Sequence, residues 1–176
     1  MKKVGLQRLE SFLRNALRRQ LTKDLRDFRM VKEADLECCV YYHLRRFLSG
    51  DEDWRFFARK HSRHTGHFID LLGFRKQMPR IAIELKWDRR QITKKDRRSL
   101  RRGIKRLRVN KAYFIATSIR AQEYSPVTKS RAEKHRLFEI FVELPLSGAE
   151  RKNWKEERKK YTSRMSRRQR RRPPSA

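Results

Sequence analysis

The chain has 176 residues, of which 49 are lysine or arginine and 20 are aspartate or glutamate, and its formal net charge at pH 7 is +29. A charge of this size makes self-repulsion costly unless a polyanion shares the surface, so we expect nucleic acid as the partner, with an anionic membrane surface as the competing polyanion. No apolar run approaches the ~20 residues that span a bilayer, and the basic first residues hold no uninterrupted apolar segment, so neither a membrane span nor a signal peptide is predicted.

Residues 1–32 are predicted to form a basic amphipathic helix ahead of the folded domain. Leucines recur at three- and four-residue steps from Leu6 to Leu21, and lysine or arginine fills much of the rest. Such a helix can pack on the domain, pair with another chain or lie along a phosphate backbone. The sequence therefore leaves open whether this helix forms the interface of a homodimer.

A second helix is predicted over residues 33–49, where an apolar stripe ends at Gly50. Glu37 lies at the edge of that stripe, and Glu33 lies one turn earlier. Both carboxylates can therefore approach whatever the stripe packs against.

The same helix carries the chain's two cysteines, Cys38 and Cys39. Neighbouring cysteines in a helix cannot form an ordinary disulfide. This favours a reducing compartment, so we expect a cytoplasmic or nucleoid-associated protein, or a nuclear one in a eukaryotic host.

The middle of the chain alternates apolar runs with polar turns and is predicted to be an α/β domain over residues 33–148. One run, residues 67–74, is apolar on both faces, as expected of a central strand covered by helices on both sides. The fold class is therefore a mixed central sheet flanked by helices, with a core in the order α–β–β–β–α–β. After the helix at 33–49, the predicted elements are strands at 54–59, 67–74 and 80–87, a helix at 91–108, and strands at 111–117 and 136–144.

Residues 149–176 have a different composition from the domain. Arginine and lysine dominate this stretch, and few apolar side chains are available to bury. We therefore expect a basic tail that is disordered when free.

Three charged residues stand out in the predicted strands. Asp70 lies in the middle of an apolar run, where an ionised carboxylate is expensive unless it is paired or bound to metal. If strands 67–74 and 80–87 form a hairpin, Asp70 and Glu84 lie close together, and Lys86 follows on the same face as Glu84. Two carboxylates and an ammonium suit a hard divalent cation held against a phosphate, whereas the structural alternative is an ion pair on a solvated sheet face.

Asp70 followed by Glu84–Leu85–Lys86 resembles the signature of the PD-(D/E)XK nuclease superfamily, whose core runs α–β–β–β–α–β. The resemblance covers roughly residues 33–118. It implies that Asp70, Glu84 and the backbone carbonyl of Leu85 bind Mg²⁺, with Mn²⁺ as an alternative, and that Lys86 is catalytic.

The resemblance also implies a glutamate on the first core helix as part of the site. Glu37 is the first choice for that role and Glu33 the second. The sequence departs from the namesake pattern at Ile69, which stands where that pattern has proline.

The basic residues nearest the expected site form a predicted phosphate-binding surface. Helix 91–108 has one apolar seam and a single acid, Asp96, whereas a merely solvated helix face normally mixes both charges. Contacts from such a surface position a duplex but read no sequence. The predicted nucleic-acid-binding residues are Lys94, Lys95, Arg97, Arg98, Arg101 and Arg102 of this helix and Arg167, Arg168, Arg170, Arg171 and Arg172 of the tail.

The sequence thus predicts a Mg²⁺-dependent nuclease that hydrolyses phosphodiester bonds, with DNA endonucleases of the restriction, repair or junction-resolving type as the expected class. The alternative is a non-catalytic DNA- or RNA-binding protein on a nuclease-like scaffold. A ribosome- or RNA-associated basic protein is a third reading, for which the chain shows no aromatic RNP run or GXXG loop.

Overall fold

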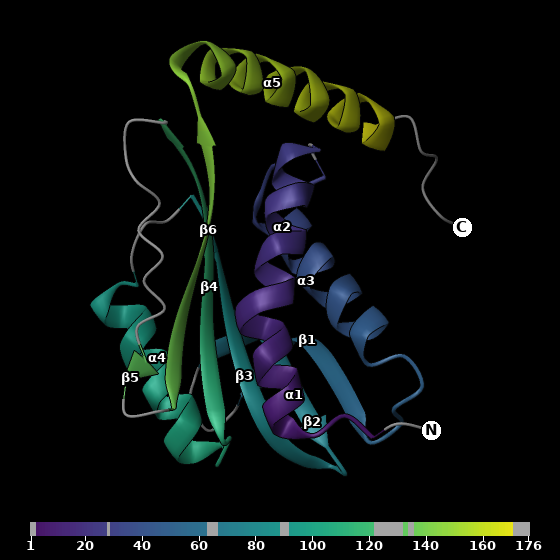
Figure 1. Ribbon diagram of the computed structural model, residues 1–176, viewed down its shortest axis with the longest axis vertical. Coiled ribbons are helices and arrows are strands. Elements are labelled where there is room, and N and C mark those ends of the chain that lie inside the picture. Colours follow the sequence, from purple (N-terminus) through teal and green to yellow (C-terminus); the bar gives the residue numbers. More distant parts are fainter. Residues whose placement is uncertain are drawn as a thin grey trace.

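A mixed sheet flanked by helices forms the centre of the molecule (Figure 1). The computed structural model describes residues 3–27, 29–62, 67–88, 92–121, 132–133 and 136–170. The strand order is β1-β2-β3-β4-β6-β5, with the β3–β4 and β4–β6 pairs parallel and the others antiparallel. The strands are β1 (Trp54–Ser62), β2 (His67–Arg75), β3 (Met78–Trp87), β4 (Lys111–Ala121), β5 (Ala132–Glu133) and β6 (Leu137–Leu146). The predicted α/β class is confirmed.

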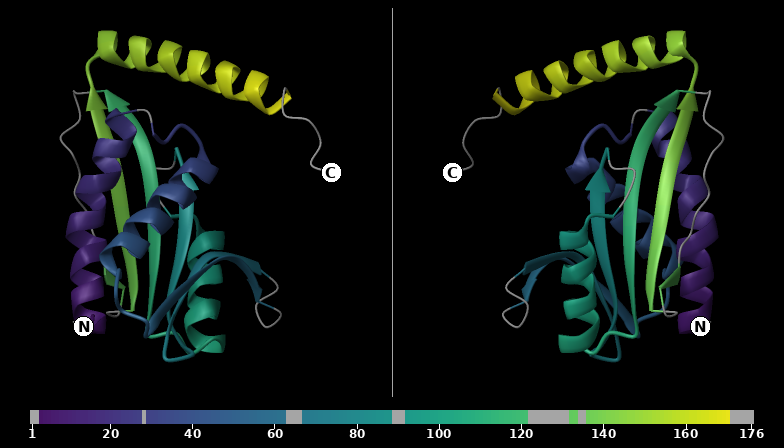
Figure 2. Two further views of the ribbon diagram at one scale, coloured as in Figure 1. Left: turned by 90° about the vertical axis from the view of Figure 1, so that its right-hand side faces the viewer. Right: turned by 90° about the vertical axis from the view of Figure 1, so that its left-hand side faces the viewer.

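Helices cover both faces of this sheet, and one more crosses its end (Figures 1 and 2). The N-terminal helix contains a π-helical turn, and α4 lies on the opposite face from it. Within the described ranges, no helix is long and apolar enough to cross a membrane. The helices are α1 (Leu6–Ser11), the π-helical turn (Phe12–Ala16), α2 (Leu17–Arg26), α3 (Glu33–Phe47), α4 (Lys94–Arg106) and α5 (Gly148–Arg170).

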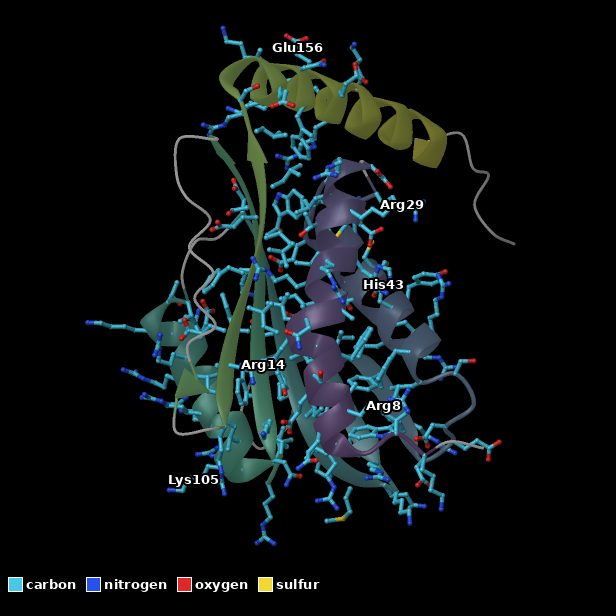
Figure 3. All side chains as sticks on the ribbon, viewed as in Figure 1. Arg8, Arg14, Arg29, His43, Lys105 and Glu156 are labelled. Atoms are coloured by element: carbon cyan, nitrogen blue, oxygen red, sulfur yellow. The ribbon has the colours of Figure 1, made fainter. Side chains whose placement is uncertain are left out.

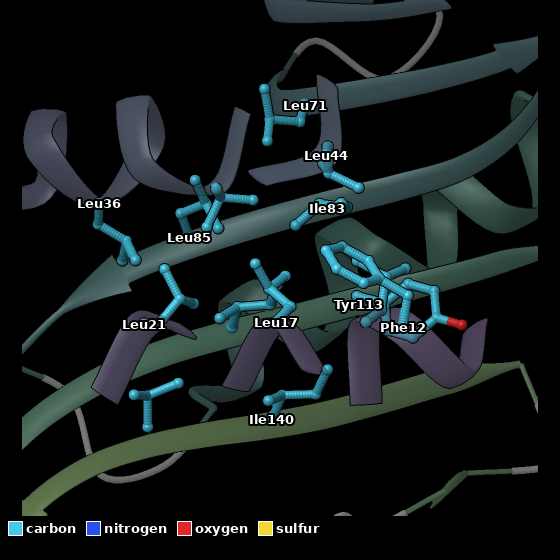
Figure 4. Packing of buried hydrophobic residues seen from close by; sticks show 14 of the residues in the cluster. Phe12, Leu17, Leu21, Leu36, Leu44, Leu71, Ile83, Leu85, Tyr113 and Ile140 are labelled. Atoms are coloured by element: carbon cyan, nitrogen blue, oxygen red, sulfur yellow. The ribbon is translucent and has the colours of Figure 1, made fainter. Parts of the chain in front are cut away.

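The N-terminal helix belongs to the core of the domain. Its leucine stripe is 0–1% exposed and shares one cluster with strands β3, β4 and β6 (Figure 4). Polar contacts tie it down as well: the Trp54 indole N–H donates to the Val4 carbonyl at 2.8 Å, and Lys111 Nζ lies 2.7 Å from Glu10 Oε2. The stripe is therefore covered by the chain's own sheet, so of the three possibilities left open by the sequence the structure shows the helix packed on the domain.

The opposite face of the sheet is covered by α4. The predicted apolar seam packs there, with Ile92 and Leu100 buried. The helix begins with a capping box, in which Thr93 Oγ1 accepts from the Asp96 N–H at 3.1 Å and Asp96 Oδ2 accepts from the Thr93 N–H at 3.3 Å. Basic side chains radiate outward from α4, with Lys105 among them (Figure 3).

The predicted disorder of the C-terminal segment is wrong for Gly148–Arg170, which forms α5. A capping box starts this helix: the Ser147 N–H donates to Glu150 Oε2 at 2.8 Å, and the Glu150 N–H donates to Ser147 Oγ at 3.3 Å. Trp154 then anchors it, because its side chain is buried and its indole N–H donates to the Leu25 carbonyl at 3.3 Å. One well-placed tryptophan thus docks a helix that is otherwise almost entirely polar.

Gly73 marks a close approach within the β1–β2 ribbon. A Cβ at this position would lie 2.7 Å from the ring of Phe56, which is buried and stacks on Trp54 at a centroid distance of 6.2 Å. We expect Gly73→Ala to lower the free energy of unfolding by about 1–3 kcal/mol, measured by urea denaturation, because the ring has to shift. Gly148→Ala is the control, since a Cβ there meets nothing within 4 Å. Equal effects of the two substitutions would contradict this account of Gly73.

Candidate active site

The β2–β3 hairpin brings the two predicted carboxylates together. Leu71 of β2 pairs with Ile83 of β3, so the same antiparallel register places Asp70 opposite Glu84. Asp70 Oδ2 also accepts a hydrogen bond from the backbone N–H of Leu85 at 2.7 Å. This bond fixes the Asp70 carboxylate against the segment that carries Glu84.

Lys86 joins these carboxylates into one cluster. Its Nζ lies 2.8 Å from Glu84 Oε1 and 4.0 Å from Asp70 Oδ2. The side chain of Lys86 is 23% exposed, whereas those of Asp70 and Glu84 are 19% and 13% exposed. The three charges are thus partly shielded from water but can still be reached from one side.

Burial makes ionisation of both carboxyl groups costly. It raises the pKa of Glu84 from 4.5 to about 7, with a further contribution from the charge of Asp70, and the contacts with Lys86 only partly offset this. Burial also raises the pKa of Asp70, although the hydrogen bond from Leu85 and the charge of Lys86 act in the opposite direction. The surroundings of the two carboxylates therefore favour a proton or a cation between them.

The charge on Lys86 is stabilised by the same neighbours. Burial alone lowers the pKa of Lys86, but the hydrogen bond to Glu84 and the charges of Glu84 and Asp70 outweigh burial and raise it. Lys86 is therefore an ammonium ion at neutral pH. It can donate hydrogen bonds and stabilise negative charge, but it cannot accept a proton in this state.

Helix α3 adds both candidate glutamates to the edge of the cluster. Glu33, the second choice from the sequence, has Oε1 3.9 Å from Lys86 Nζ and Oε2 3.3 Å from the Trp87 N–H. Glu37, the first choice, is near enough for its charge to raise the pKa of Asp70, as does that of Glu33. Glu33 is thus in direct contact with the segment that carries Lys86, and its place in the first turn of α3 is the signal for it in the sequence.

The donors in this cluster fit a hard divalent cation. Among the described residues, no group of three or more His, Cys, Asp or Glu side chains is placed to hold a metal ion. Mg²⁺, however, keeps several waters and is usually held by one or two carboxylates together with substrate phosphates. Asp70 and Glu84 supply that pair, with Leu85 between Glu84 and Lys86 in β3. A cation would also relieve the repulsion that raises the pKa of both carboxyl groups.

The basic residues of α4 flank the cluster. The first turn of this helix is close enough for Asp96 to act on the pKa of Glu84. Arg97 is held inside the domain, because its Nη2 lies 2.6 Å from Oε1 of the buried Glu139. The other predicted nucleic-acid-binding residues of α4 are exposed, namely Lys94, Lys95, Arg98, Arg101 and Arg102.

Only some of the predicted nucleic-acid-binding residues of the C-terminal segment lie in the described part of the chain. Arg167, Arg168 and Arg170 belong to α5, and Arg171 and Arg172 lie outside the described residues. Sequence reasoning missed that the first turns of α5 return to the sheet and bring cations to the ends of β3 and β4. The Ser147–Glu150 capping pattern was the signal that could have revealed this helix.

No family model, no curated protein and no solved structure matches this chain. The paired carboxylates, the lysine between them and the basic helix beside them are therefore the grounds on which a function can be argued.

Proposed function

We propose that this protein is a Mg²⁺-dependent nuclease that hydrolyses phosphodiester bonds in DNA, acting as an endonuclease, with Mn²⁺ as an alternative cofactor. The observation that carries the proposal is the position of Lys86 Nζ, 2.8 Å from Glu84 and 4.0 Å from Asp70 on the adjacent strand. The order α3–β1–β2–β3–α4–β4 supports the resemblance to PD-(D/E)XK nucleases. The net charge of +29 supports a polyanionic substrate.

Asp70, Glu84 and Lys86 have different roles in the proposed hydrolysis. When bound, the cation polarises a phosphoryl oxygen and lowers the pKa of a water molecule. Asp70 and Glu84 hold their charges in fixed positions, because the Leu85 N–H and the Lys86 ammonium hydrogen-bond to them. Lys86 donates to the attacking water or to a phosphoryl oxygen and so stabilises negative charge as it develops. The water releases one proton to solvent as its oxygen bonds to phosphorus, one P–O ester bond breaks, and the leaving oxygen takes up a proton from solvent.

The outward face of α4 positions the substrate. Lys94, Lys95 and Arg98 are exposed at the start of this helix, on the side of the catalytic cluster. Their charges contact phosphates without distinguishing bases, so we propose that binding depends on salt more than on sequence.

The decisive experiment incubates the full chain with linear, circular, branched and single-stranded DNA, in Mg²⁺ or in EDTA. We expect cleavage that requires the metal and falls by about 10²–10³-fold in Lys86→Ala, because a positioned charge at the reacting phosphate is lost. Lys23→Ala is the matched control, since Lys23 is exposed on α2, which covers the opposite face of the sheet from α4. Cleavage of the circular form identifies endonuclease action.

The same assay separates the nuclease from a non-catalytic binder. Tight, salt-sensitive binding without cleavage in Mg²⁺ or Mn²⁺ would reject the enzymatic proposal and leave the three charges as an ion-pair network on a sheet. Equal cleavage rates in Lys86→Ala and Lys23→Ala would reject the role of Lys86 while leaving the nuclease proposal itself in place.

A further inference from the structure

A cavity of about 130 Å³ lies where α5 crosses the ends of β3 and β4. It is distinct from the catalytic cluster, because Trp87 and Lys86 are consecutive in β3 and their side chains point to opposite faces of the sheet. Figure 2 shows α5 passing over this end of the sheet. The residues that line the cavity include Trp87, Thr117, Arg151, Trp154, Lys155 and Arg158.

The floor of the cavity holds polar groups that have no partner among the described residues. Thr117 is 1% exposed and its Oγ1 makes no hydrogen bond within that part of the chain. Trp87 pairs with Thr117 across the parallel ladder, and its buried Nε1 finds no acceptor among the residues that the structure describes. Ser118 lines the cavity too, and within the same ranges its hydroxyl has no partner. Buried donors of this kind are costly unless a ligand or water satisfies them.

The wall formed by α5 is cationic. Arg151, Lys155 and Arg158 occur at steps of four and three residues, so they share one face of the helix. Arg158 is fixed by aromatic contacts, with its Cζ 5.5 Å from the ring centroid of Trp87 and 5.9 Å from that of Trp154. One carboxylate, Asp88, also lines the cavity, so the cations outnumber the acid.

We propose that this cavity binds a phosphate group of a nucleic-acid strand, as a second anion subsite beside the catalytic cluster; the identity of the strand rests on the proposed nuclease function. A hydroxyl, an indole N–H, guanidinium groups and an ammonium are all donors, and a phosphate offers only acceptors. The volume suits one phosphate rather than a whole nucleotide. A strand that passes over the end of β3 can place one phosphate in the cavity and another at Lys86, which fixes where the strand is cut relative to the bound phosphate.

Binding can be measured without any cleavage, because two of the three tryptophans of the chain line the cavity. The full chain in EDTA is titrated with inorganic phosphate while tryptophan fluorescence is recorded. We expect a saturable change whose Kd rises about tenfold or more in the double variant Arg151→Gln/Lys155→Gln, because two charge-assisted contacts are lost. The control Lys76→Gln/Lys152→Gln removes the same charge from exposed positions that neither line the cavity nor belong to α4, and its Kd is expected to stay within about twofold of the wild-type value.

Thr117→Val provides an independent test, since it removes the buried hydroxyl with little change of volume. It is expected to weaken phosphate binding while leaving the thermal midpoint at or above that of the wild type, because the unpartnered hydroxyl is gone. Equal affinities in the cavity variants and in the control would overturn the proposal, and so would the absence of any phosphate-dependent change.

Competition then distinguishes the sources of the phosphate. Short oligonucleotides with a phosphate or a hydroxyl at the 5′ or 3′ end are added to the phosphate-loaded protein in EDTA. Displacement by an oligonucleotide supports a strand subsite, and the better end identifies the polarity of the strand. Saturable phosphate binding that no oligonucleotide displaces would overturn the strand assignment. Since none of these measurements needs cleavage, failure of the subsite and failure of the nuclease proposal are separate results.

Discussion

Replacing Glu84 by glutamine is expected to abolish metal-dependent cleavage and, above pH 7, to make the metal-free protein more stable. Even the outer partners of a metal site typically contribute 10–100-fold to its affinity or activity, so loss of a proposed ligand is expected to cost more than about 100-fold in cleavage rate. The gain in stability has a separate origin, since glutamine resembles the protonated carboxyl that the buried site favours.

The sign of the stability effect follows from the pKa of Glu84. Burial raises this pKa from 4.5 to about 7, so between these values the folded protein binds a proton that the unfolded chain releases. The contribution of Glu84 to the free energy of unfolding is therefore full below the lower value and declines as the pH rises through about 7. Glu84→Gln does not lose this contribution, so above that pH the variant is expected to be more stable than the wild type by on the order of 3 kcal/mol.

Urea denaturation of the wild type and of Glu84→Gln in EDTA, from pH 5 to pH 8, measures this difference. The two curves are expected to converge at the acidic end and to separate as the pH rises. Glu52→Gln is the control, because Glu52 is exposed. Mg²⁺ is expected to stabilise the wild type and not the Glu84 variant. A variant that is less stable than the wild type at pH 8 would contradict the account of a strained carboxylate pair.

Trp154→Ala is expected to release α5 and to lower the free energy of unfolding by about 3 kcal/mol, in the range found for buried aromatic truncations. Trp154 is 4% exposed, and its indole N–H donates to the Leu25 carbonyl at 3.3 Å. The rest of α5 is mostly lysine, arginine and other polar residues, so no other buried apolar side chain of its described part replaces this anchor.

Limited trypsin digestion measures the release directly, since α5 is rich in cleavage sites. The variant is expected to be cut rapidly within 148–170 while the sheet domain survives. Met78→Ala is the control, because Met78 is 55% exposed and its truncation leaves no cavity. Slow digestion of Trp154→Ala, equal to that of the control, would show that other contacts hold the helix.

The proximity of Asp70, Glu84 and Lys86 could be predicted from the sequence because a β-hairpin brings residues at a known spacing close together in space. Alternation along β3 puts Glu84 and Lys86 on one face, and the short turn after β2 sets the register that places Asp70 opposite Glu84. The same reasoning could not rank the two helical glutamates. Glu33 and Glu37 are one turn apart, and the packing angle of α3 on the sheet, which the sequence does not contain, sets how each of them approaches Asp70 and Lys86.

The sequence was least informative where a single contact decides the structure. In α5, one buried tryptophan gives no periodic stripe, so the composition alone favoured disorder. The two-residue strand β5 is too short for alternation to be visible. At the N-terminus the leucine stripe predicted a helix correctly. The stripe alone does not indicate which element packs against it, because the covering strands β4 and β6 come more than 80 residues later in the chain.

That separation in the chain determines when the protein can finish folding during its synthesis. The carbonyl of Leu25 meets its partner on Trp154 only after 129 further residues have been added, which takes a ribosome on the order of ten seconds at about 5–20 residues per second. Until β6 emerges, the nascent chain carries a row of leucines, from Leu9 to Leu25, that lacks its covering strand. Substitutions in β6 or around Trp154 are therefore expected to act on the yield of folded protein, by prolonging a vulnerable intermediate, before they act on any property of the finished molecule.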